Sequence, residues 1–482
     1  MILDTFEKRF NKKIEKEEKG SIIISLSLVF GLIFLIILNA ILNVTLTELK
    51  KAKKRVAWKE SLEIAEAGLN YYRWCLNHGL GDSCNLSKDY YSPSGQLLGK
   101  FSLEKKTENY CGEIISRDVT STGWTNNEPD VKRKINVLYA RSSVAKYAYL
   151  LNDNVWAGVD REIRGLYHSN GGIRMDGENK SLVTSAKDKW VCTSSFGCNP
   201  CPISAGCWFE GSTCFCPGVF TTANGNKNLF QFPATPFDFD SITIDLAQIK
   251  DKAQLQSLYL PPAKEVNPQG KGYHLISNQD GTIEVRIITR LKKDFAYSSE
   301  EGWHYDYFRI SKEYYYATFN ISASCPVVFV EDNLWIEGKI KGKITIASAN
   351  LINSNKETTI ILPGNIEYVN QDGSDGLALI AEKNILISPD SPNNMILQGI
   401  FIAQKGHFGR NLYYWNIKDK LEITGAIVSN GRVGTKWSSG SFVVSGYLKR
   451  ENYVDSNLIY NPPPFVPYAE SDFKILKWRE SQ

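Results

Sequence analysis

The sequence predicts a mainly β protein of the α+β class. It has a long N-terminal helix, a small antiparallel sheet and a β-solenoid-like (β-helix) body with a cysteine-rich insertion. Three observations lead to this fold class: an uninterrupted apolar stretch near the N-terminus, short aliphatic strands separated by Gly, Asn and Pro turns, and ten cysteines of which six crowd into one segment. The 24 Tyr and 22 Phe also suit pleated β surfaces.

At 482 residues the chain exceeds what one hydrophobic core usually organises, so we expect several structural units. In chain order these are a leader at 1–20, a transmembrane helix at 21–45, an amphipathic helix plus sheet at 46–143, a β-solenoid-like domain at 144–190 and 326–450, a cysteine-rich and α/β insertion at 191–325, and an extended tail at 451–482. The 56 basic and 52 acidic side chains leave a net charge of only +4, which creates no field that would concentrate a polyanion. Nucleic acid is therefore not expected as a partner.

The apolar stretch runs from Ser21 to Val44 without a charge, which is long enough to cross a bilayer. Backbone N–H and C=O groups in hydrocarbon must be paired within the segment, so the stretch is predicted to be a helix that contacts membrane lipid through residues 21–45. The alternative is a buried core helix, but such helices are usually shorter. A cleaved signal peptide would also be shorter and would end in small residues, whereas this segment continues into Thr45 and Leu46.

Beyond the membrane the helical pattern continues as an apolar stripe at spacings of three and four residues. Its members are Trp58, Leu62, Ala65, Leu69, Tyr72 and Leu76. Charged and polar residues occupy the opposite face, and Gly79 and Gly81 follow as helix breakers. One continuous helix from Ser21 to Leu76 would be about 84 Å long at 1.5 Å per residue.

Three sequence features at this end carry a family resemblance. The charged leader ends in Glu17-Glu18-Lys19-Gly20, the apolar helix begins at Ser21, and the helix proceeds through Ser61-Leu62-Glu63-Ile64-Ala65-Glu66-Ala67-Gly68-Leu69. This arrangement resembles the type IV pilin-like proteins, specifically those with a PilX-type N-terminal region.

The resemblance implies a minor pilin-like subunit of a type IV pilus or related filament, displaying a surface domain for assembly or adhesion. A prepilin peptidase would cut the Gly20–Ser21 bond, and the other partners would be pilin subunits and the assembly machinery. The chain would reside as a single-pass protein in the cytoplasmic membrane with its body exported, and at the cell surface or in the pilus after assembly.

Two details refine this expectation. Most members of the family carry Glu at the fifth mature position, where this chain has Ser25; its absence resembles the larger minor subunits thought to sit at filament tips. Five basic residues follow the apolar stretch, and an alternative role for them is contact with anionic lipid head groups. They are Lys50, Lys51, Lys53, Lys54 and Arg55.

The body is predicted to be β-rich. Strands are expected at Leu97–Glu104, Cys111–Val119 and Ile135–Ala140. Farther on, Asp153-Asn154-Val155-Trp156 parallels Asp332-Asn333-Leu334-Trp335, which indicates a repeat. Short apolar strands then recur every 15 to 23 residues, around Ile344, Ile366, Ile385, Ile400, Ile423 and Val443. Each is interpreted as one coil of a solenoid with Gly and Asn at its corners; an irregular β-sandwich is the alternative.

The cysteines are interpreted as disulfides because their number is even and the N-terminus is of an export type. The candidates are Cys75, Cys84, Cys111, Cys192, Cys198, Cys201, Cys207, Cys214, Cys216 and Cys325. Their pairing does not follow from the sequence. Cys198 and Cys201 form half of a zinc signature, but no second pair and no close His completes it, so neither a metal nor another cofactor is expected. A helix at Ser241–Leu258 and a hairpin at Tyr273–Ile288 complete the insertion.

No catalytic motif is present, and the chain is not expected to be an enzyme. His168 and His407 each lie beside a Gly turn and are interpreted as corner residues. The segment from Asp372 to Gly376 carries two carboxylates and is interpreted as a solvated turn rather than a Ca²⁺ loop. The alternative function is a membrane-anchored extracellular β-helix protein that binds or cleaves glycans.

Overall fold

The computed structural model of the chain describes residues 3–81, 83–353, 355–440 and 442–481, with side chains from residue 23 to residue 480 of these ranges. The chain divides into two compact units. Unit 1 comprises Met1–Lys105, Val119–Val137 and Lys477–Gln482, and unit 2 comprises Lys106–Asp118 and Leu138–Leu476.

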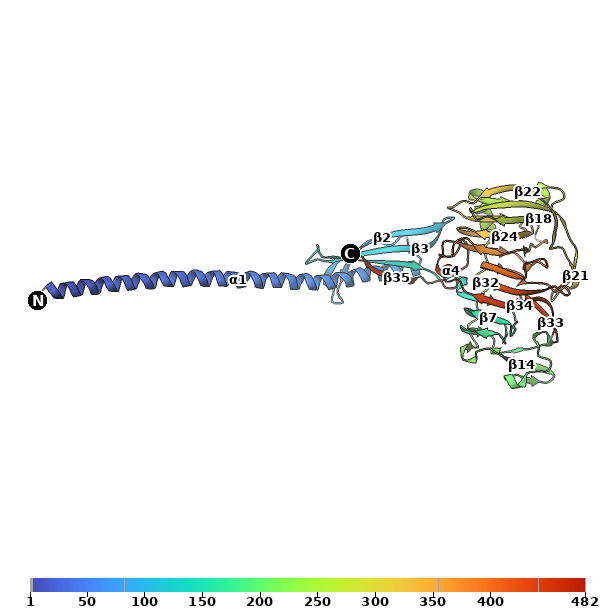
Figure 1. Cartoon of the computed structure of the whole chain (residues 1–482), viewed down its shortest axis with the longest axis horizontal. Coiled ribbons are helices and arrows are strands. Elements are labelled where there is room, and N and C mark those ends of the chain that lie inside the picture. Colours follow the sequence, from blue (N-terminus) through green and yellow to red (C-terminus); the bar gives the residue numbers. More distant parts are fainter. Residues whose placement is uncertain (1–2, 82, 354, 441, 482) are drawn as a thin grey trace. The chain divides into compact units, whose positions relative to one another are not determined.

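A single helix, α1 (Leu3–Asn77), accounts for most of unit 1 (Figure 1). It contains the predicted helix from Ser21 to Leu76 and extends back through the leader segment. The absence of proline from this stretch lets the hydrogen-bond ladder run unbroken. The helix ends before Gly79, whose φ of +72° takes the left-handed conformation common after a helix, and the Leu80 N–H donates to the Cys75 carbonyl at 2.9 Å.

A five-stranded sheet has the strand order β1-β2-β3-β4-β35. The strands are β1 (Ser87–Tyr91), β2 (Leu97–Tyr110), β3 (Glu113–Thr125), β4 (Lys132–Ala140) and β35 (Lys474–Ser481). The predicted strands Leu97–Glu104 and Ile135–Ala140 lie within β2 and β4, whereas the predicted strand Cys111–Val119 begins two residues too early, because Cys111 and Gly112 form the turn before β3. The sequence patterns did not predict β1 and β35. The expected extended tail at 451–482 is also corrected: it holds the end of β34 (Phe442–Tyr453), helix α4 (Ser456–Tyr460) and β35.

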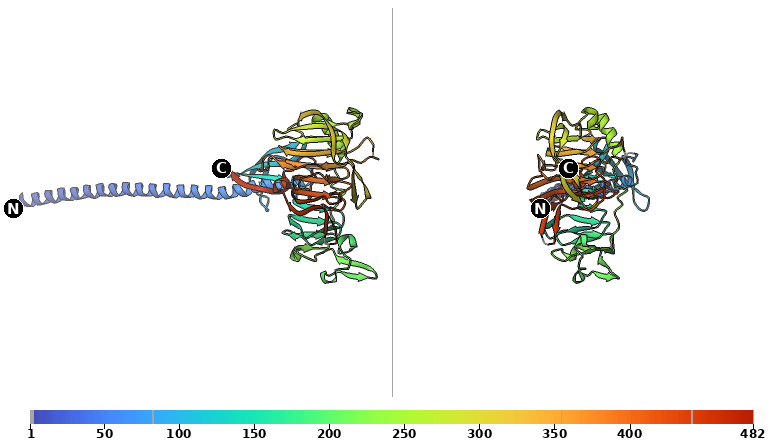
Figure 2. Two further views of the ribbon diagram at one scale, coloured as in Figure 1. Left: turned by 45° about the vertical axis from the view of Figure 1, so that its right-hand side comes forward. Right: turned by 90° about the vertical axis from the view of Figure 1, so that its right-hand side faces the viewer.

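Unit 2 is built from parallel ladders in which successive strands come from successive passes of the chain (Figures 1 and 2). The longest ladder runs β17 (Leu258–Leu260), β23 (Val327–Val330), β25 (Lys343–Ser348), β28 (Gly376–Ala381), β30 (Asn394–Ala403), β32 (Ile417–Ser429), β5 (Tyr147–Leu151), β8 (Leu166–Ser169), β11 (Val183–Ser185) and β16 (Phe230–Gln231).

Three further parallel ladders accompany the longest one. The first runs β18 (Gly272–Ser277), β24 (Leu334–Ile340), β26 (Ile360–Leu362), β29 (Ile385–Ile387) and β31 (Phe408–Gly409). The second runs from β24 through β27 (Ile366–Tyr368), β30, β32, β34 (Phe442–Tyr453) and β7 (Arg161–Arg164) to β10 (Glu178–Asn179). The third is short: β6 (Val155–Ala157), β9 (Ile173–Met175) and β15 (Val219–Phe220).

The remaining elements attach to these ladders. They are β19 (Thr282–Leu291), β22 (Ile310–Asn320) and β33 (Lys436–Ser439), the hairpin β20 (Asp294–Ser298) and β21 (Gly302–Asp306), the small sheet β12 (Lys189–Val191), β14 (Thr213–Pro217) and β13 (Trp208–Glu210), and the helices α2 (Leu246–Gln256) and α3 (Ala263–Val266). Short 3₁₀ turns lie at Val144–Lys146, Ser194–Phe196, Ile203–Ala205 and Lys227–Leu229.

The chain meets itself in the middle of the longest ladder. From β5 it proceeds through β8 and β11 to β16, crosses to β17 through residues 232–257, and then returns strand by strand until β32 pairs with β5, Ile427 lying opposite Tyr149. The crossing segment includes α2 and contacts the ladder strands, for example where the Gln404 side chain donates to the Ile244 carbonyl at 3.1 Å. This path brings β5 and β32 together although they are far apart in the sequence.

The strand spacing predicted for the ladders is correct only in part. Thr345 pairs with Ala378, Ala378 with Ile400, and Ile400 with Ala426, and other strands lie between these positions in the sequence. The steps between these paired positions are 33, 22 and 26 residues, so only the second lies within the predicted interval of 15 to 23 residues. Some predicted neighbours, such as Ile366 of β27 and Ile385 of β29, lie on different ladders, whereas Ile400 and Ile423 do lie on paired strands.

Asparagine side chains occupy equivalent corners in the self-similar segments. In each case the side-chain oxygen accepts a hydrogen bond from a backbone N–H of the next pass: Asn154 from Gly172 at 2.6 Å, Asn333 from Thr359 at 2.9 Å and Asn384 from His407 at 2.8 Å. An unpaired N–H at a buried corner would be costly, which explains why the same residue type recurs.

The core of unit 2 is formed by aliphatic residues from all the long ladders, many of them fully buried. Every residue of β25 and β28 is buried, so these strands are covered on both faces, as parallel strands usually are. Helix α2 supplies part of the outer cover through Ile249 and Ala253. The C-terminal region supplies more, because Leu458, Phe465 and Val466 belong to the same core.

Candidate functional site

The apolar part of α1 is exposed along its described length. Every described residue from Ile23 to Val56 is exposed, including the large apolar side chains Phe30, Phe34 and Leu35. Among the residues that the structure describes, α1 is the one helix long and apolar enough to cross a membrane. Exposure of this much apolar surface in water is strongly unfavourable, so the segment fits a membrane anchor.

Polar side chains inside the apolar stretch and just after it hydrogen-bond to one another or to the helix backbone. The Asn43 amide donates to Asn39 Oδ1 at 3.3 Å, and the Thr45 and Thr47 hydroxyls donate to carbonyls one turn earlier at 2.7 Å each. Hydrogen bonds within the helix lower the cost of placing these groups in hydrocarbon.

The upper part of α1 packs closely within unit 1. Of the predicted stripe, Ala65, Leu69, Tyr72 and Leu76 are buried, Leu62 is half-buried, and Trp58 is 48% exposed. Five further residues of this part of the helix are buried, and all except Ile64 are small or polar, so the apolar spacing did not include them: Ala57, Ser61, Ile64, Gly68 and Cys75.

Glycine makes the approach between helix and sheet possible. A Cβ on Gly123 of β3 would lie 2.4 Å from the Ala65 nitrogen and from the Ser61 carbonyl oxygen, so the strand backbone touches the helix backbone directly. A Cβ on Gly68 would lie 2.5 Å from Ser121 Oγ. The Ser61 hydroxyl also donates to the Val131 carbonyl at 2.8 Å. The upper half of the rod is thereby fixed to its sheet.

The predicted cleavage site, Gly20 and Ser21, lies within α1, and the side chain of Ser21 is outside the described part of the chain. Cleavage there stays a prediction. Ser25 lies in the exposed apolar segment.

A basic hollow of about 560 Å³ surrounds Trp58 in unit 1. Lys54 and Arg55, two of the five basic residues noted after the apolar stretch, line it together with Lys59 and Lys132. The guanidinium of Arg133 lies 4.1 Å from the Trp58 ring centroid. A Trp among basic side chains just beyond an apolar span is typical of a membrane interface.

All ten cysteines are paired. The disulfides are Cys75–Cys84, Cys111–Cys325, Cys192–Cys198, Cys201–Cys214 and Cys207–Cys216. Cys75–Cys84 joins the last turn of α1 to the loop that follows it. Cys111–Cys325 closes the widest loop, with a sequence separation of 214, beside a hydrogen bond from the Cys111 N–H to the Ser324 carbonyl.

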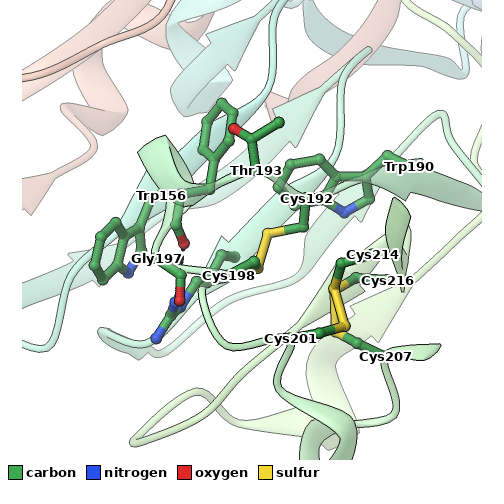
Figure 3. The surroundings of a disulfide bond; sticks show 12 residues. Trp156, Trp190, Cys192, Thr193, Gly197, Cys198, Cys201, Cys207, Cys214 and Cys216 are labelled. Atoms are coloured by element: carbon green, nitrogen blue, oxygen red, sulfur yellow. Dashed lines mark hydrogen bonds between the residues drawn. A yellow bond between two sulfur atoms is a disulfide. The ribbon is translucent and has the colours of Figure 1, made fainter. Parts of the chain in front are cut away.

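Three disulfides replace a conventional core in the cysteine-rich segment (Figure 3). They hold the β12-β14-β13 sheet, and all six cysteines are buried together with Trp190 and Phe196. Arg174 holds this segment by donating to the carbonyls of Phe196 and Gly197 at 2.9 and 2.8 Å, and its guanidinium lies 4.3 Å from the Trp156 ring centroid.

The sulfur atoms of Cys192, Cys198 and Cys216 lie within 4.8 Å of one another. Each belongs to a disulfide, and zinc requires thiolate sulfur. The cluster in its oxidised form is therefore structural.

An exposed aromatic row lies on the β20–β21 hairpin of unit 2. Strand alternation places Phe295, Tyr297, Trp303 and Tyr305 on one face, and Tyr414 joins them from a neighbouring loop. The Trp303 ring is nearly parallel to Phe295 (10°, centroids 5.0 Å apart) and to Tyr414 (13°, 5.3 Å). Phe295, Trp303, Tyr305 and Tyr414 are each between 46% and 58% exposed.

The opposite face of the same hairpin borders a polar cleft of about 310 Å³, which we call the hairpin cleft. His304 and Asp306 line it from the hairpin, and Asn384 and His407 line it from ladder corners. Tyr305 belongs both to the cleft lining and to the aromatic row, so the two features are continuous. The volume falls at the lower end of the range for small-ligand sites.

Polar groups in the hairpin cleft are held in place by hydrogen bonds. Asp306 Oδ1 lies 3.0 Å from His304 Nε2, while its Oδ2 accepts from the Asn411 amide at 2.9 Å and the Tyr413 hydroxyl at 2.7 Å. Partial burial by itself lowers the pKa of His304, but the Gly302 carbonyl and the Asp306 carboxylate outweigh it and raise that pKa. At the cleft mouth, His407 Nδ1 lies 2.9 Å from Glu300 Oε1.

The sequence interpretation missed this site. His407 lies at a corner, as predicted, and it also lines the cleft. The corner prediction is wrong for His168, which lies in strand β8 and is buried against Thr184. The predicted solvated turn at Asp372–Gly376 is correct for Asp372, which is exposed, and wrong for Asp375. Asp375 is buried and accepts hydrogen bonds from the Gly342 and Asn370 N–H groups. The alternation of Phe295, Tyr297, Trp303 and Tyr305 was the signal that could have revealed the aromatic row.

Comparison with known proteins gives little further information. No protein-family model and no curated protein matches the sequence. Among solved structures, the competence-associated pilin ComZ from Thermus thermophilus matches over 88% of this chain and 98% of its own, at 12% identity and a TM-score of 0.31. At that identity and TM-score, the similarity establishes neither a shared fold nor a shared function.

Proposed function

We propose that the chain is a minor pilin-like subunit of a type IV pilus or related filament, anchored in the cytoplasmic membrane and displaying unit 2 for surface contact or adhesion. The observation that carries this proposal is the difference in burial between the two ends of α1. Residues from Ile23 to Val44 are uncharged, mostly apolar and exposed, whereas Ile64, Ala65 and Leu69 are buried within unit 1. A rod that is bare at one end and packed at the other suits a subunit that passes from membrane to filament.

The disulfides support export. Five bonds that use every cysteine form and persist in an oxidising compartment, not in a reducing cytosol. The chain beyond the apolar segment therefore faces outward, as a single-pass surface protein does.

The displayed part is a β-solenoid in this proposal. The parallel ladders and the repeated Asn corners support that architecture, because each pass of the chain stacks its strands on the previous pass. A stack of this kind gives long, rigid side faces, which suits a role in binding and assembly rather than in catalysis.

The N-terminus of the mature protein tests the proposal. Processing by a prepilin peptidase, as the PilX-type N-terminal pattern implies, would leave Ser21 as a methylated first residue. We expect intact-mass and peptide analysis of membrane-extracted protein to find this terminus. Gly20→Val should block the cut, whereas Gly31→Val in the same helix should leave it unaffected. An intact Met1 in the wild type would contradict the proposal.

Filament entry needs a separate measurement. Sheared surface filaments should contain the wild-type chain at low abundance relative to the major subunit. A chain that is correctly cut at Gly20 but stays wholly in the membrane fraction would favour a membrane-anchored protein that joins no filament.

A further inference from the structure

We propose that the aromatic row and the hairpin cleft of unit 2 together form a binding site for an uncharged oligosaccharide. The proposal deepens the surface-contact role and rests on it only for the site's exposure outside the cell. The row supplies flat apolar surfaces, the cleft supplies fixed polar groups, and Tyr305 belongs to both.

The two surfaces together have the chemistry that recognises a sugar ring. A pyranose ring has a face of C–H groups and a rim of hydroxyls, so it is recognised by an aromatic plane beside hydrogen-bonding side chains. Trp303 and Tyr414 are nearly parallel and about half exposed, although exposed aromatic surface is unfavourable without a partner. Glu300, His304 and His407 lie within the continuous cleft and provide both donors and acceptors.

The side chains of the site are held in place before a ligand binds. The cleft groups do not have to be ordered when a ligand arrives, because Asp306 is buried and bound by Asn411 and Tyr413. On the row, Tyr297 packs edge-on against Trp437 with ring centroids 5.5 Å apart, which fixes the hairpin over its neighbour. Preorganisation reduces the entropy lost on binding.

The charged side chains of the cleft are mostly acidic. The cleft is lined by four carboxylates and one lysine, together with two histidines. Acidic polysaccharides would be repelled by this excess of negative charge, so the fitting class is a neutral glycan. The carboxylates are Glu300, Glu301, Asp306 and Glu357, and the lysine is Lys383.

The test uses the full-length protein in a detergent without a sugar head group. The probes are immobilised hexasaccharides of β-1,4-linked glucose, β-1,4-linked N-acetylglucosamine and mannose, with polygalacturonate as the acidic comparison. We expect measurable binding to at least one neutral hexasaccharide and weaker binding to polygalacturonate. Trp303→Ala and Tyr305→Ala should each lower the affinity about three- to tenfold, which is the range for the loss of one aromatic contact.

Phe209→Ala is the matched control, because Phe209 is 54% exposed on another short strand of the same unit. It should leave the affinity unchanged. If Trp303→Ala unfolds, Trp303→Leu keeps an apolar side chain without the flat ring and should still weaken binding. Glu300→Gln should weaken binding while leaving the melting temperature within about 2 °C, as expected for an exposed residue.

Three results would overturn the proposal: no binding to any neutral hexasaccharide, equal loss of binding in Phe209→Ala and Trp303→Ala, or preferential binding of polygalacturonate. Self-association of the protein that Trp303→Ala abolishes, without glycan binding, would also overturn it and identify the row as a contact between copies. Analysis of the mature N-terminus in the same preparation separates failure of this site from failure of the pilin-like assignment.

Discussion

Gly425 provides a sensitive test of the ladder geometry in unit 2. Its φ is +136°, and an added Cβ would lie 1.9 Å from the carbonyl oxygen of Gly399, its register partner on the next strand. Alanine would therefore carry two costs. The backbone conformation costs about 1–3 kcal/mol for a residue with a Cβ, and the forced separation of two strands costs about 1–3 kcal/mol more.

The sum for Gly425→Ala is about 2–6 kcal/mol. Unfolding entropy is about 2.1 cal/mol/K per residue, so for the roughly 350 residues of unit 2 this corresponds to a fall of about 3–8 °C in Tm. Differential scanning calorimetry of the full-length protein, with near-ultraviolet circular dichroism as a second probe, measures the shift.

Gly434→Ala is the control because an added Cβ there meets nothing within 4 Å and the backbone needs no positive φ. Its Tm should stay within about 1 °C, since a substitution without new contacts usually changes stability by less than about 0.5 kcal/mol. Equal shifts in the two variants, or none in Gly425→Ala, would refute the register between β30 and β32.

Three other predictions follow from named contacts. Replacing both Cys111 and Cys325 by Ser should lower the free energy of unfolding of unit 2 by up to about 5 kcal/mol in the chain-entropy model, as measured by calorimetry. A decrease smaller than the one expected for opening a nine-residue loop would contradict this pairing. Burial raises the pKa of Asp160, but hydrogen bonds from Arg450 and Lys436 outweigh burial and lower this pKa to about 2. Because this folded-state pKa lies below the unfolded value, stability present above pH 4 should fall by about 2 kcal/mol as the pH drops from about 4 to 2, and acid titration of Asp160→Asn should lack that step. The double variant Leu35→Arg/Ile36→Arg should leave the carbonate-washed membrane fraction, since each arginine costs about 2.5–3.5 kcal/mol at the centre of a spanning helix; Leu35→Ala should stay.

Patterns of local period were sufficient to predict the elements near the N-terminus. The three-and-four spacing of Leu69, Tyr72 and Leu76 placed the buried helix face correctly, and the end of α1 at Asn77 lies one residue from the predicted end. The hairpin turn at Asp280 and Gly281 was also correct, because that dipeptide fits a tight turn whose second residue has positive φ, here +93°.

Long-range pairing could not be predicted from such patterns. β35 lies more than 300 residues from its neighbour β4 in the sequence, and its alternation alone does not identify a partner. The pairing of β32 with β5 depends on the crossing segment at residues 232–257, whose direction has no local signal. Cys111 and Cys325 belong to the same category, because their proximity results from the fold that they then lock.

The aromatic row shows a different limit. Alternating aromatic residues in Phe295–Tyr297 and Trp303–Tyr305 are equally typical of a buried sheet face. Only the structure distinguishes the exposed face from the face that carries Ala296 and Asp306, which are buried.

In the proposed topology, α1 crosses the membrane near its N-terminal end and everything after it lies on the outer side. Protease treatment of intact spheroplasts, followed by peptide mapping without reductant, tests this most directly. We expect external protease to remove peptides from beyond residue 50, to leave a membrane-protected fragment containing residues 23–44, and to release the five disulfide-linked peptide pairs. Complete protection of the body until the cells are lysed, together with free thiols, would contradict it.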